Sequence, residues 1–162
     1  MTIVAPPRPF SSDPMAAVTQ ANIDWVAVVP YAYTRQYKTA VNFGNSTWQW
    51  WGEKPDGART TIKTAKAAGL KVMLKPQVYV PGSWTGAIIF DTEQEWKAWE
   101  SNYENYIMTF AKIAAEESVA LFCIGTEFKV SSINRPQFWV NLIEKIKLVY
   151  DCLLYTSDAA DE

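Results

Sequence analysis

The 162-residue sequence contains no histidine. Within this chain there can be no Ser-His-Asp triad, no histidine-ligated zinc and no histidine general base. Cysteine is nearly absent as well: the two cysteines cannot form a disulfide framework or a four-thiolate metal site. The sequence therefore implies no metal site and no organic cofactor.

Charge of one sign and long hydrophobic runs are also lacking. Fifteen Lys and Arg face 17 Asp and Glu, so the net charge of −2 offers no electrostatic footprint for nucleic acid or an anionic membrane. No apolar run approaches the roughly 20 residues that a membrane span requires. With 49% hydrophobic and 20% charged residues, the composition predicts one globular domain with a sizeable core.

Aromatic residues, in contrast, are plentiful. The chain has 8 Trp, 8 Tyr and 7 Phe, together 14% of its residues. Such side chains bury large apolar areas, and their ring faces also stack on sugars.

Both ends of the chain look unusual. Residues 152–162 match the translation of a sequencing adapter, so we expect a non-native tail and exclude it from the fold prediction. The alternative is a genuine fifth strand, because Leu153, Leu154 and Tyr155 are apolar and favour β-structure. At the other end, Met1 leads directly into an apolar run with no recognisable signal peptide, so the sequence itself predicts no compartment.

Strand and helix patterns alternate along the chain. Continuous apolar runs are typical of parallel strands buried on both faces, and four occur, at residues 2–5, 25–29, 70–74 and 119–124. Helical patterns follow them, at residues 13–21, 58–68, 93–117 and beyond Pro136, with Asp13, Asp91 and Asn134 as expected N-caps and Gly69 as a C-terminal glycine. The resulting βαβαβαβα order predicts an α/β fold with right-handed parallel crossovers.

The loops indicate which α/β fold this is. Pro6 and Pro7 follow the first strand where a dinucleotide-binding sheet would have a glycine-rich turn. The longest loops follow the second and third strands, at the end where a (β/α)₈ TIM barrel carries its active site. Because such a barrel needs about 250 residues, we predict that residues 1–151 are its first four βα units, a truncated half-barrel.

Glu127 is the clearest candidate for chemistry. It follows Gly125 and Thr126 where the fourth apolar strand ends, a position that is typical of catalytic residues in barrels. We expect partial burial at the barrel mouth, and burial raises a carboxyl pKa, as a general acid requires at neutral pH. Glycoside hydrolysis uses two carboxyl groups, about 5 Å apart in retaining enzymes. The alternative is an ordinary exposed glutamate that caps the next loop.

Other polar and aromatic candidates also follow strands. Lys75 can donate hydrogen bonds to hydroxyls or pair with Glu127, or it can be a solvated surface lysine. Tyr31 can point its hydroxyl into the mouth or pack at the rim.

Two tryptophan-bearing loops offer sugar platforms. Residues 48–53 hold three tryptophans, of which Trp50 is a candidate platform. The alternative is that Trp50 and Trp51 close the barrel top against the helices, and we expect at least one of the two to do so. Trp84, in a polar loop between Gly82 and Gly86, is the better platform. Trp96 and Trp99 lie on the apolar stripe of a helix and are predicted to be core residues.

Four motifs in order resemble glycoside hydrolase family 113, a TIM-barrel family of β-mannanase-like enzymes: WWGEKP at 50–55, GLKVMLKP at 69–76, WTG at 84–86 and GTE at 125–127. The resemblance covers residues 1–151 and implies a retaining mechanism with Glu127 as general acid/base. The nucleophile would follow a seventh strand, outside this chain. Related barrels carry Asn before the acid/base to contact the sugar 2-hydroxyl; here Thr126 stands in that place.

The resemblance also sets the wider expectations. The parent protein would be a monomeric glycosidase acting on β-mannan-like polysaccharide or oligosaccharide, exported to reach that substrate, while residues 1–162 alone would be inactive. The alternative is a non-catalytic carbohydrate-binding TIM barrel that keeps the aromatic platforms. A third class is a different barrel enzyme. A metal-dependent amidohydrolase is disfavoured by the lack of histidine in this half of the barrel. No phosphate loop of a sugar-phosphate isomerase is visible, but such loops usually follow strands seven and eight, so that alternative stays open.

Overall fold

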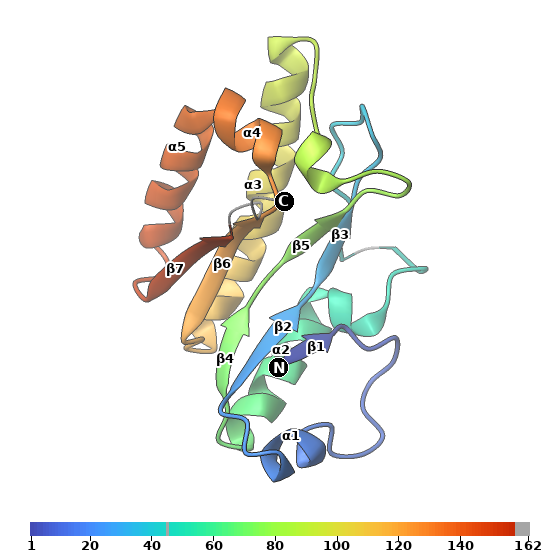
Figure 1. Cartoon of the computed structure of the whole chain (residues 1–162), viewed down its shortest axis with the longest axis vertical. Coiled ribbons are helices and arrows are strands. Elements are labelled where there is room, and N and C mark those ends of the chain that lie inside the picture. Colours follow the sequence, from blue (N-terminus) through green and yellow to red (C-terminus); the bar gives the residue numbers. More distant parts are fainter. Residues whose placement is uncertain (45, 158–162) are drawn as a thin grey trace.

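The computed structural model describes residues 1–44 and 46–157 (Figure 1). Strands and helices alternate along the chain, with two short 3₁₀ helices. In order they are β1 (Thr2–Val4), α1 (Ala16–Gln20), β2 (Trp25–Val29), β3 (Tyr31–Tyr33), η1 (Trp51–Glu53), α2 (Pro55–Ala67), β4 (Lys71–Leu74), β5 (Gln77–Tyr79), η2 (Thr85–Ala87), α3 (Glu93–Glu116), β6 (Leu121–Thr126), α4 (Lys129–Asn134), α5 (Pro136–Lys147) and β7 (Leu153–Ser157).

The strands form a parallel sheet, as the continuous apolar runs predict. Five of them lie in the order β1-β2-β4-β6-β7, and every pairing is parallel. The remaining two, β3 and β5, pair with each other in parallel and extend β2 and β4 beyond their carboxyl ends. Each of the four predicted strands is present, shifted by at most two residues at either end.

Two prolines explain why the central strands are split. Pro30 separates β2 from β3, and Pro76 lies between β4 and β5. Proline has no N–H to donate to a strand ladder, so the pairing is interrupted there. The buried Tyr106 hydroxyl of α3 donates to the carbonyls of Pro30 (3.1 Å) and Gln77 (3.0 Å). These hydrogen bonds connect both strand interruptions to the helix.

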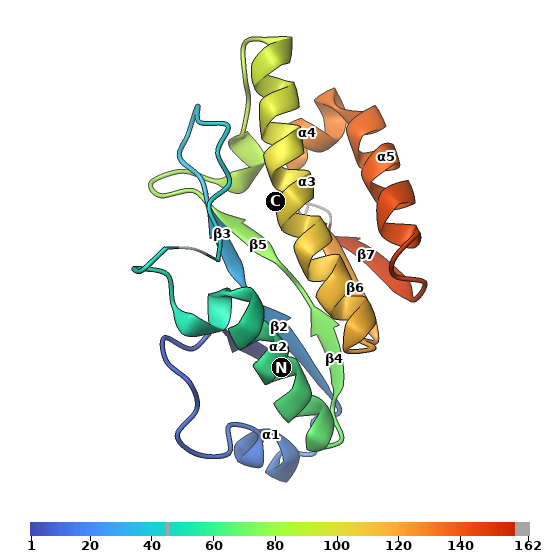
Figure 2. The same cartoon turned by 180° about the vertical axis from the view of Figure 1, so that it is seen from behind.

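The helices cover only one face of the sheet. Figure 2 shows α2 and α3 in front of the strands, whereas Figure 1 shows the opposite face of the strands uncovered. Side chains alternate accordingly: Val26 and Val28 are buried under the helices, while Trp25 is exposed on the other face. Leu153 and Tyr155 of β7 are exposed in the same alternating way. The core therefore lies between the sheet and its helical layer.

Helix α3 supplies the largest share of this core. Trp96 and Trp99 are buried, as predicted from the helical stripe, and Trp99 stacks on Tyr103 with ring centroids 5.2 Å apart. Among the described residues, the Trp99 indole nitrogen is a buried donor without a hydrogen-bond partner. Gly69 follows α2 with a φ of +81°, the left-handed conformation expected of a C-terminal glycine.

The predicted N-caps are wrong in their details. Thr92, and not Asp91, caps α3 through a capping box with Glu95. Asn134 ends α4, a short helix that the sequence did not indicate, and α5 begins after Arg135 without a side-chain cap. Asp13 accepts the Met15 N–H at 2.8 Å one turn before α1. Short polar residues recur at each of these sites, so the sequence pattern alone could not single out which one caps.

At residues 153–157, the structure matches the alternative expectation, a fifth strand in the sheet. Leu153–Ser157 form β7, which pairs in parallel with β6. Residues 158–162 of the predicted tail lie outside the described residues. That residues 152–162 are non-native stays a prediction, since strand pairing depends on the backbone and on apolar side chains and not on the origin of the segment.

Candidate active site at the carboxyl ends of the strands

Glu127 lies where β6 ends, next to a depression of about 250 Å³ at the carboxyl ends of the strands. Side chains from three strands and the loop after β5 line this depression: Tyr31, Gln77, Val78, Tyr79, Val80, Ser83, Trp84, Thr85, Thr126 and Glu127. Four of the predicted site residues thus come together: Tyr31, Trp84, Thr126 and Glu127.

The backbone of Glu127 is strained. Its φ is +63°, in the left-handed region that residues with a Cβ rarely adopt. Such conformations cost about 1–3 kcal/mol and cluster at functional sites. The turn carries the side chain out of the sheet, and Glu127 is exposed, whereas the sequence predicts partial burial. The prediction of partial burial is wrong because it considers only where the strand ends, and not the left-handed turn that the backbone makes at Glu127.

Trp84 holds the Glu127 carboxylate. Its indole Nε1–H donates to Glu127 Oε2 at 2.8 Å, across 43 residues of sequence. The indole ring lies directly against Gly86, where a Cβ would come within 2.4 Å of ring atoms. One of the two glycines that flank Trp84 is therefore required for close packing. The bond engages one carboxylate oxygen, and no hydrogen bond within the described chain engages Glu127 Oε1.

Tyr31 places a neutral hydroxyl in the same depression. Its partly buried position raises its pKa above the usual value, and the nearby charges of Glu127 and Glu53 raise it further. The hydroxyl therefore stays protonated at neutral pH and can donate a hydrogen bond. A donor facing a carboxylate and an open depression is suited to bind a hydroxyl-bearing ligand.

Thr126 lines the depression but is buried within the strand end. Its hydroxyl lies 3.6 Å from Cys123 Sγ, close enough for a weak hydrogen bond in either direction. Cys123 is also fully buried, in line with its predicted role as a small core residue. Thr126 is thus positioned at the floor of the site, beside Glu127.

Lys75 and Trp50 are not among the residues that line the depression. Lys75 is half-buried at the end of β4, and its backbone N–H donates to Val28. No ion pair within 4.0 Å joins it to Glu127 in the described part of the chain. Trp50 is exposed at the start of η1, whereas Trp51 packs edge-on against Phe10.

Sequence reasoning missed Gln77 and Tyr79. Both lie on β5 and line the depression. A signal was present: Tyr31-Ala32-Tyr33 and Gln77-Val78-Tyr79 alternate polar-tipped and apolar residues just after each proline. That alternation is typical of a half-exposed strand, so it indicates a short parallel pair with polar tips on one face.

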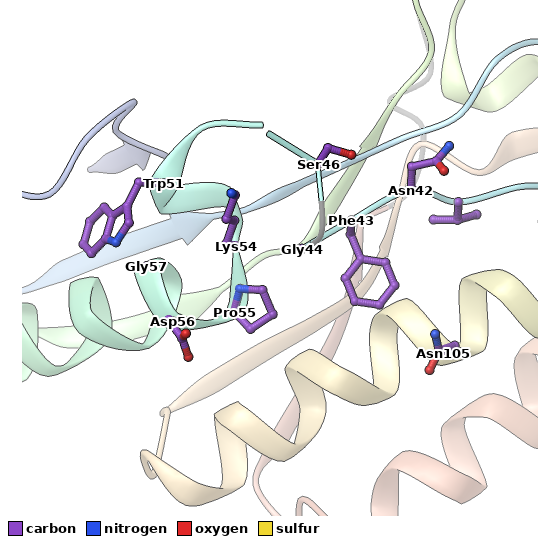
Figure 3. A pocket seen from close by; sticks show the side chains of 11 residues that line it. Asn42, Phe43, Gly44, Ser46, Trp51, Lys54, Pro55, Asp56, Gly57 and Asn105 are labelled. Atoms are coloured by element: carbon purple, nitrogen blue, oxygen red, sulfur yellow. The ribbon is translucent and has the colours of Figure 1, made fainter. Parts of the chain in front are cut away.

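A larger cavity of about 590 Å³ lies away from Glu127 (Figure 3). The ring of Phe43, before α2, points toward the helix α3 that carries Asn105, and Lys54 and Pro55 also line the cavity. None of the predicted site residues lines it.

Two further findings bear on ligand classes. Within residues 1–44 and 46–157, no group of three or more His, Cys, Asp or Glu side chains is placed to hold a metal ion. No helix in this same part of the chain has the length and apolar character needed to cross a membrane.

Solved structures share this architecture. The GH113 β-mannanase AaManA from Alicyclobacillus acidocaldarius, in complex with ManMIm, superposes with a TM-score of 0.80 at 24% identity, over 96% of this chain and 52% of that one. A complex structure of a GH113 β-1,4-mannanase gives a TM-score of 0.79 at 25% identity, over 99% and 55%. Another GH113 β-1,4-mannanase structure gives 0.75 at 28% identity, over 85% and 45%.

The chain spans about half the length of these solved structures. The likeness confirms the predicted α/β fold as part of a TIM barrel. No curated protein matches the sequence. The model of Glycoside Hydrolase Family 113 matches residues 8–162, nearly the whole chain. The chain therefore belongs to glycoside hydrolase family 113, as its motifs indicate.

Proposed function

We propose that this chain is the N-terminal half of a retaining glycoside hydrolase that cleaves β-mannan-like polysaccharide or oligosaccharide, with Glu127 as general acid/base. The observation that carries the proposal is the strained, solvent-facing Glu127 at the end of β6, held by the Trp84 indole. Family membership and the β-mannanase neighbours support the reaction class and the substrate.

The proposal gives separate tasks to the two oxygens of Glu127. Oε2 accepts the Trp84 N–H, so Oε1 is the oxygen available to carry the proton. In the first step, Oε1–H protonates the glycosidic oxygen as the bond to the anomeric carbon breaks and a nucleophilic carboxylate takes that carbon. In the second step, the Glu127 carboxylate removes a proton from the water that releases the sugar.

The nucleophile belongs to a part of the barrel beyond this chain. Glu127 is the one carboxylate among the described residues that line the depression, whereas retention requires a second carboxyl group about 5 Å away. We therefore expect the 162-residue polypeptide alone to show no turnover. Hydrolysis of linear β-mannan by this purified polypeptide, abolished by Glu127→Gln, would overturn the half-site assignment.

The decisive experiment uses the complete protein and the variant Glu127→Gln. Release of reducing ends from linear β-mannan should fall at least about 100-fold, the lower range of a general acid/base contribution. Azide should restore turnover of an aryl β-mannoside, because a good leaving group needs no acid and azide needs no base. Glu144→Gln, an exposed glutamate of α5, is the matched control.

Two outcomes would contradict the proposal in different ways. Near wild-type hydrolysis by Glu127→Gln would remove Glu127 from the acid/base role. Binding of manno-oligosaccharide by the complete protein without any turnover would assign the alternative, a non-catalytic carbohydrate-binding barrel.

A further inference from the structure

We propose that Tyr33, Trp48 and Tyr79 form a second sugar-binding subsite beside the Glu127 depression, and that Glu53 is the positioning residue that holds it. The identity of the sugar rests on the proposed function. The subsite itself rests on ring contacts, exposure and two buried polar anchors in the described structure.

The three rings are contiguous and lead away from Glu127. Tyr79 lines the Glu127 depression, and its ring centroid lies 5.9 Å from that of Tyr33. Tyr33 in turn contacts Trp48 edge-on, at 4.7 Å between centroids. Trp48 and Tyr79 are 58% and 50% exposed. The aromatic surface is therefore continuous with the candidate active site and open to a ligand.

A buried carboxylate holds this surface in place. Glu53 is only 3% exposed, and its Oε1 accepts the Tyr33 hydroxyl at 2.6 Å while its Oε2 accepts the Trp50 N–H at 3.0 Å. Burial and the bond to Glu53 raise the pKa of Tyr33 well above its usual value, so its hydroxyl remains the donor. Burying a carboxylate is costly unless both oxygens are paired, as they are here.

A second buried polar side chain anchors the same loop. Gln49, 5% exposed, donates to the Tyr31 carbonyl at 2.7 Å and accepts the Gly44 N–H at 2.7 Å. Gln49 and Glu53, which follow Trp48 in the sequence, are thus buried and paired, while the Trp48 ring is mostly exposed. The buried polar side chains Gln49 and Glu53 hold the loop that carries Trp48, although the Trp48 ring itself buries little apolar area. We infer that the loop holds this ring for a ligand.

The chemistry of the surface selects the ligand class. The Tyr33 hydroxyl already donates its hydrogen bond to Glu53. A ligand can therefore contact the three aromatic rings and the Tyr79 hydroxyl, and none of these three side chains carries a formal charge. Ring faces of this kind stack on the C–H faces of neutral pyranoses. We therefore assign to it a neutral sugar unit of a β-linked oligosaccharide, one that lies beyond the sugars at Glu127.

The test measures binding in the complete protein carrying Glu127→Gln, so that turnover plays no part. Titration calorimetry with mannohexaose and mannobiose should show Trp48→Ala weakening the longer ligand about tenfold and the shorter one less than twofold. Tyr37→Ala, a more exposed tyrosine with no ring contact in the described structure, is the matched control and should leave both affinities unchanged.

Glu53→Gln tests the positioning role. The amide places an oxygen at one of the two carboxylate positions and an NH₂ donor at the other, so only one of the two existing bonds can stay as it is, and the same length-dependent loss should follow. With catalytic Glu127 restored, KM for long substrates should rise while kcat on short ones stays unchanged. Thermal melting distinguishes this from unfolding, and Tyr33→Phe, which keeps the ring, should retain more affinity than Tyr33→Ala.

Failure of the subsite and failure of the proposed function look different. If mannohexaose binds the parent and binds Trp48→Ala and Glu53→Gln within twofold, the subsite is wrong and the hydrolase proposal stands. If the parent binds cellohexaose or xylohexaose instead, with the same dependence on Trp48, the subsite stands and the mannan assignment fails. If the parent binds none of these oligosaccharides, both are overturned.

Discussion

The helix-covered face of the sheet and the rim at its carboxyl end use the same kinds of side chain in opposite ways. Under the helices, Trp99, Tyr103 and Phe110 are fully buried. Trp99 stacks on Tyr103, and Phe110 packs edge-on against Tyr106. At the rim, Trp48 and Tyr79 are about half exposed, although they also contact a neighbouring ring. Aromatic content alone therefore does not distinguish core from candidate binding surface.

Polar partners make the difference between the two regions. Under the helices, tyrosine hydroxyls donate to backbone carbonyls and so complete the sheet, as Tyr103 does to Ile124 at 2.8 Å. At the rim, hydrogen bonds join side chains that are distant in the sequence, as in Trp84 to Glu127 and Tyr33 to Glu53. The first arrangement contributes to stability, whereas the second fixes the orientation of groups that face solvent.

Truncating one ring from each region should separate them most clearly. In the complete protein, Phe110→Ala removes a fully buried ring and should lower the free energy of unfolding by about 3–5 kcal/mol. Trp48→Ala removes a ring that is mostly exposed and should change it by less than about 0.5 kcal/mol. Urea unfolding followed by circular dichroism measures both, and equal losses would abolish the distinction.

The tyrosine hydroxyls under the helices should matter next. Tyr106→Phe removes the donor to the carbonyls of Pro30 and Gln77 and leaves them less well satisfied in the interior. The expected loss is about 1–3 kcal/mol in the free energy of unfolding. Tyr37→Phe is the control at an exposed tyrosine. A neutral Tyr106→Phe would mean that the strand breaks at the two prolines do not depend on this bond.

The covered region could be predicted from sequence far better than the rim. Apolar runs of four to six residues gave the strands, and the stripe through Trp96 and Trp99 gave α3, because burial imposes a local period on the sequence. The contacts at the rim join residues that are 20 and 43 positions apart, in Tyr33–Glu53 and Trp84–Glu127. No local period reports such pairs.

The missed elements have similar physical causes. β3 and β5 are three residues each, and they follow Pro30 and Pro76, beyond the points where the continuous apolar runs stop. The exposure of Glu127 depends on a single backbone angle that a residue with a Cβ rarely adopts, so nothing in the local pattern predicts it. In contrast, the position of Glu127 after β6 follows directly from where the apolar run stops, and that part of the site was predicted.

A rim variant should change activity more than stability. Trp84→Phe keeps a ring against Gly86 but cannot donate to Glu127 Oε2. We expect kcat on linear β-mannan to fall about tenfold, or about 1.4 kcal/mol of activation free energy, because the carboxylate loses its orientation. KM should change less, and the free energy of unfolding should stay within about 0.5 kcal/mol. An unchanged kcat would show that Trp84 does not orient Glu127 and would leave stacking on the sugar as its remaining proposed role.

The smallest expected effect lies at the outer edge of the helical layer, where Arg135 joins α5 to α3. Arg135 binds Glu93 through two nitrogens, at 2.7 and 2.9 Å, and this hydrogen bonding lowers the Glu93 pKa below its usual 4.5. A lowered native pKa means that the ion pair stabilises the fold above about pH 4.5 and that this stabilisation is lost as the pH falls through the native value.

The urea midpoint of the wild type should therefore exceed that of Glu93→Gln slightly at about pH 7, and the two should converge in acid. Because Glu93 is exposed, added salt at about 1 M should also shrink the difference. A difference that instead grows in acid would reverse the assigned sign and show that Glu93 is stabilised in its protonated form.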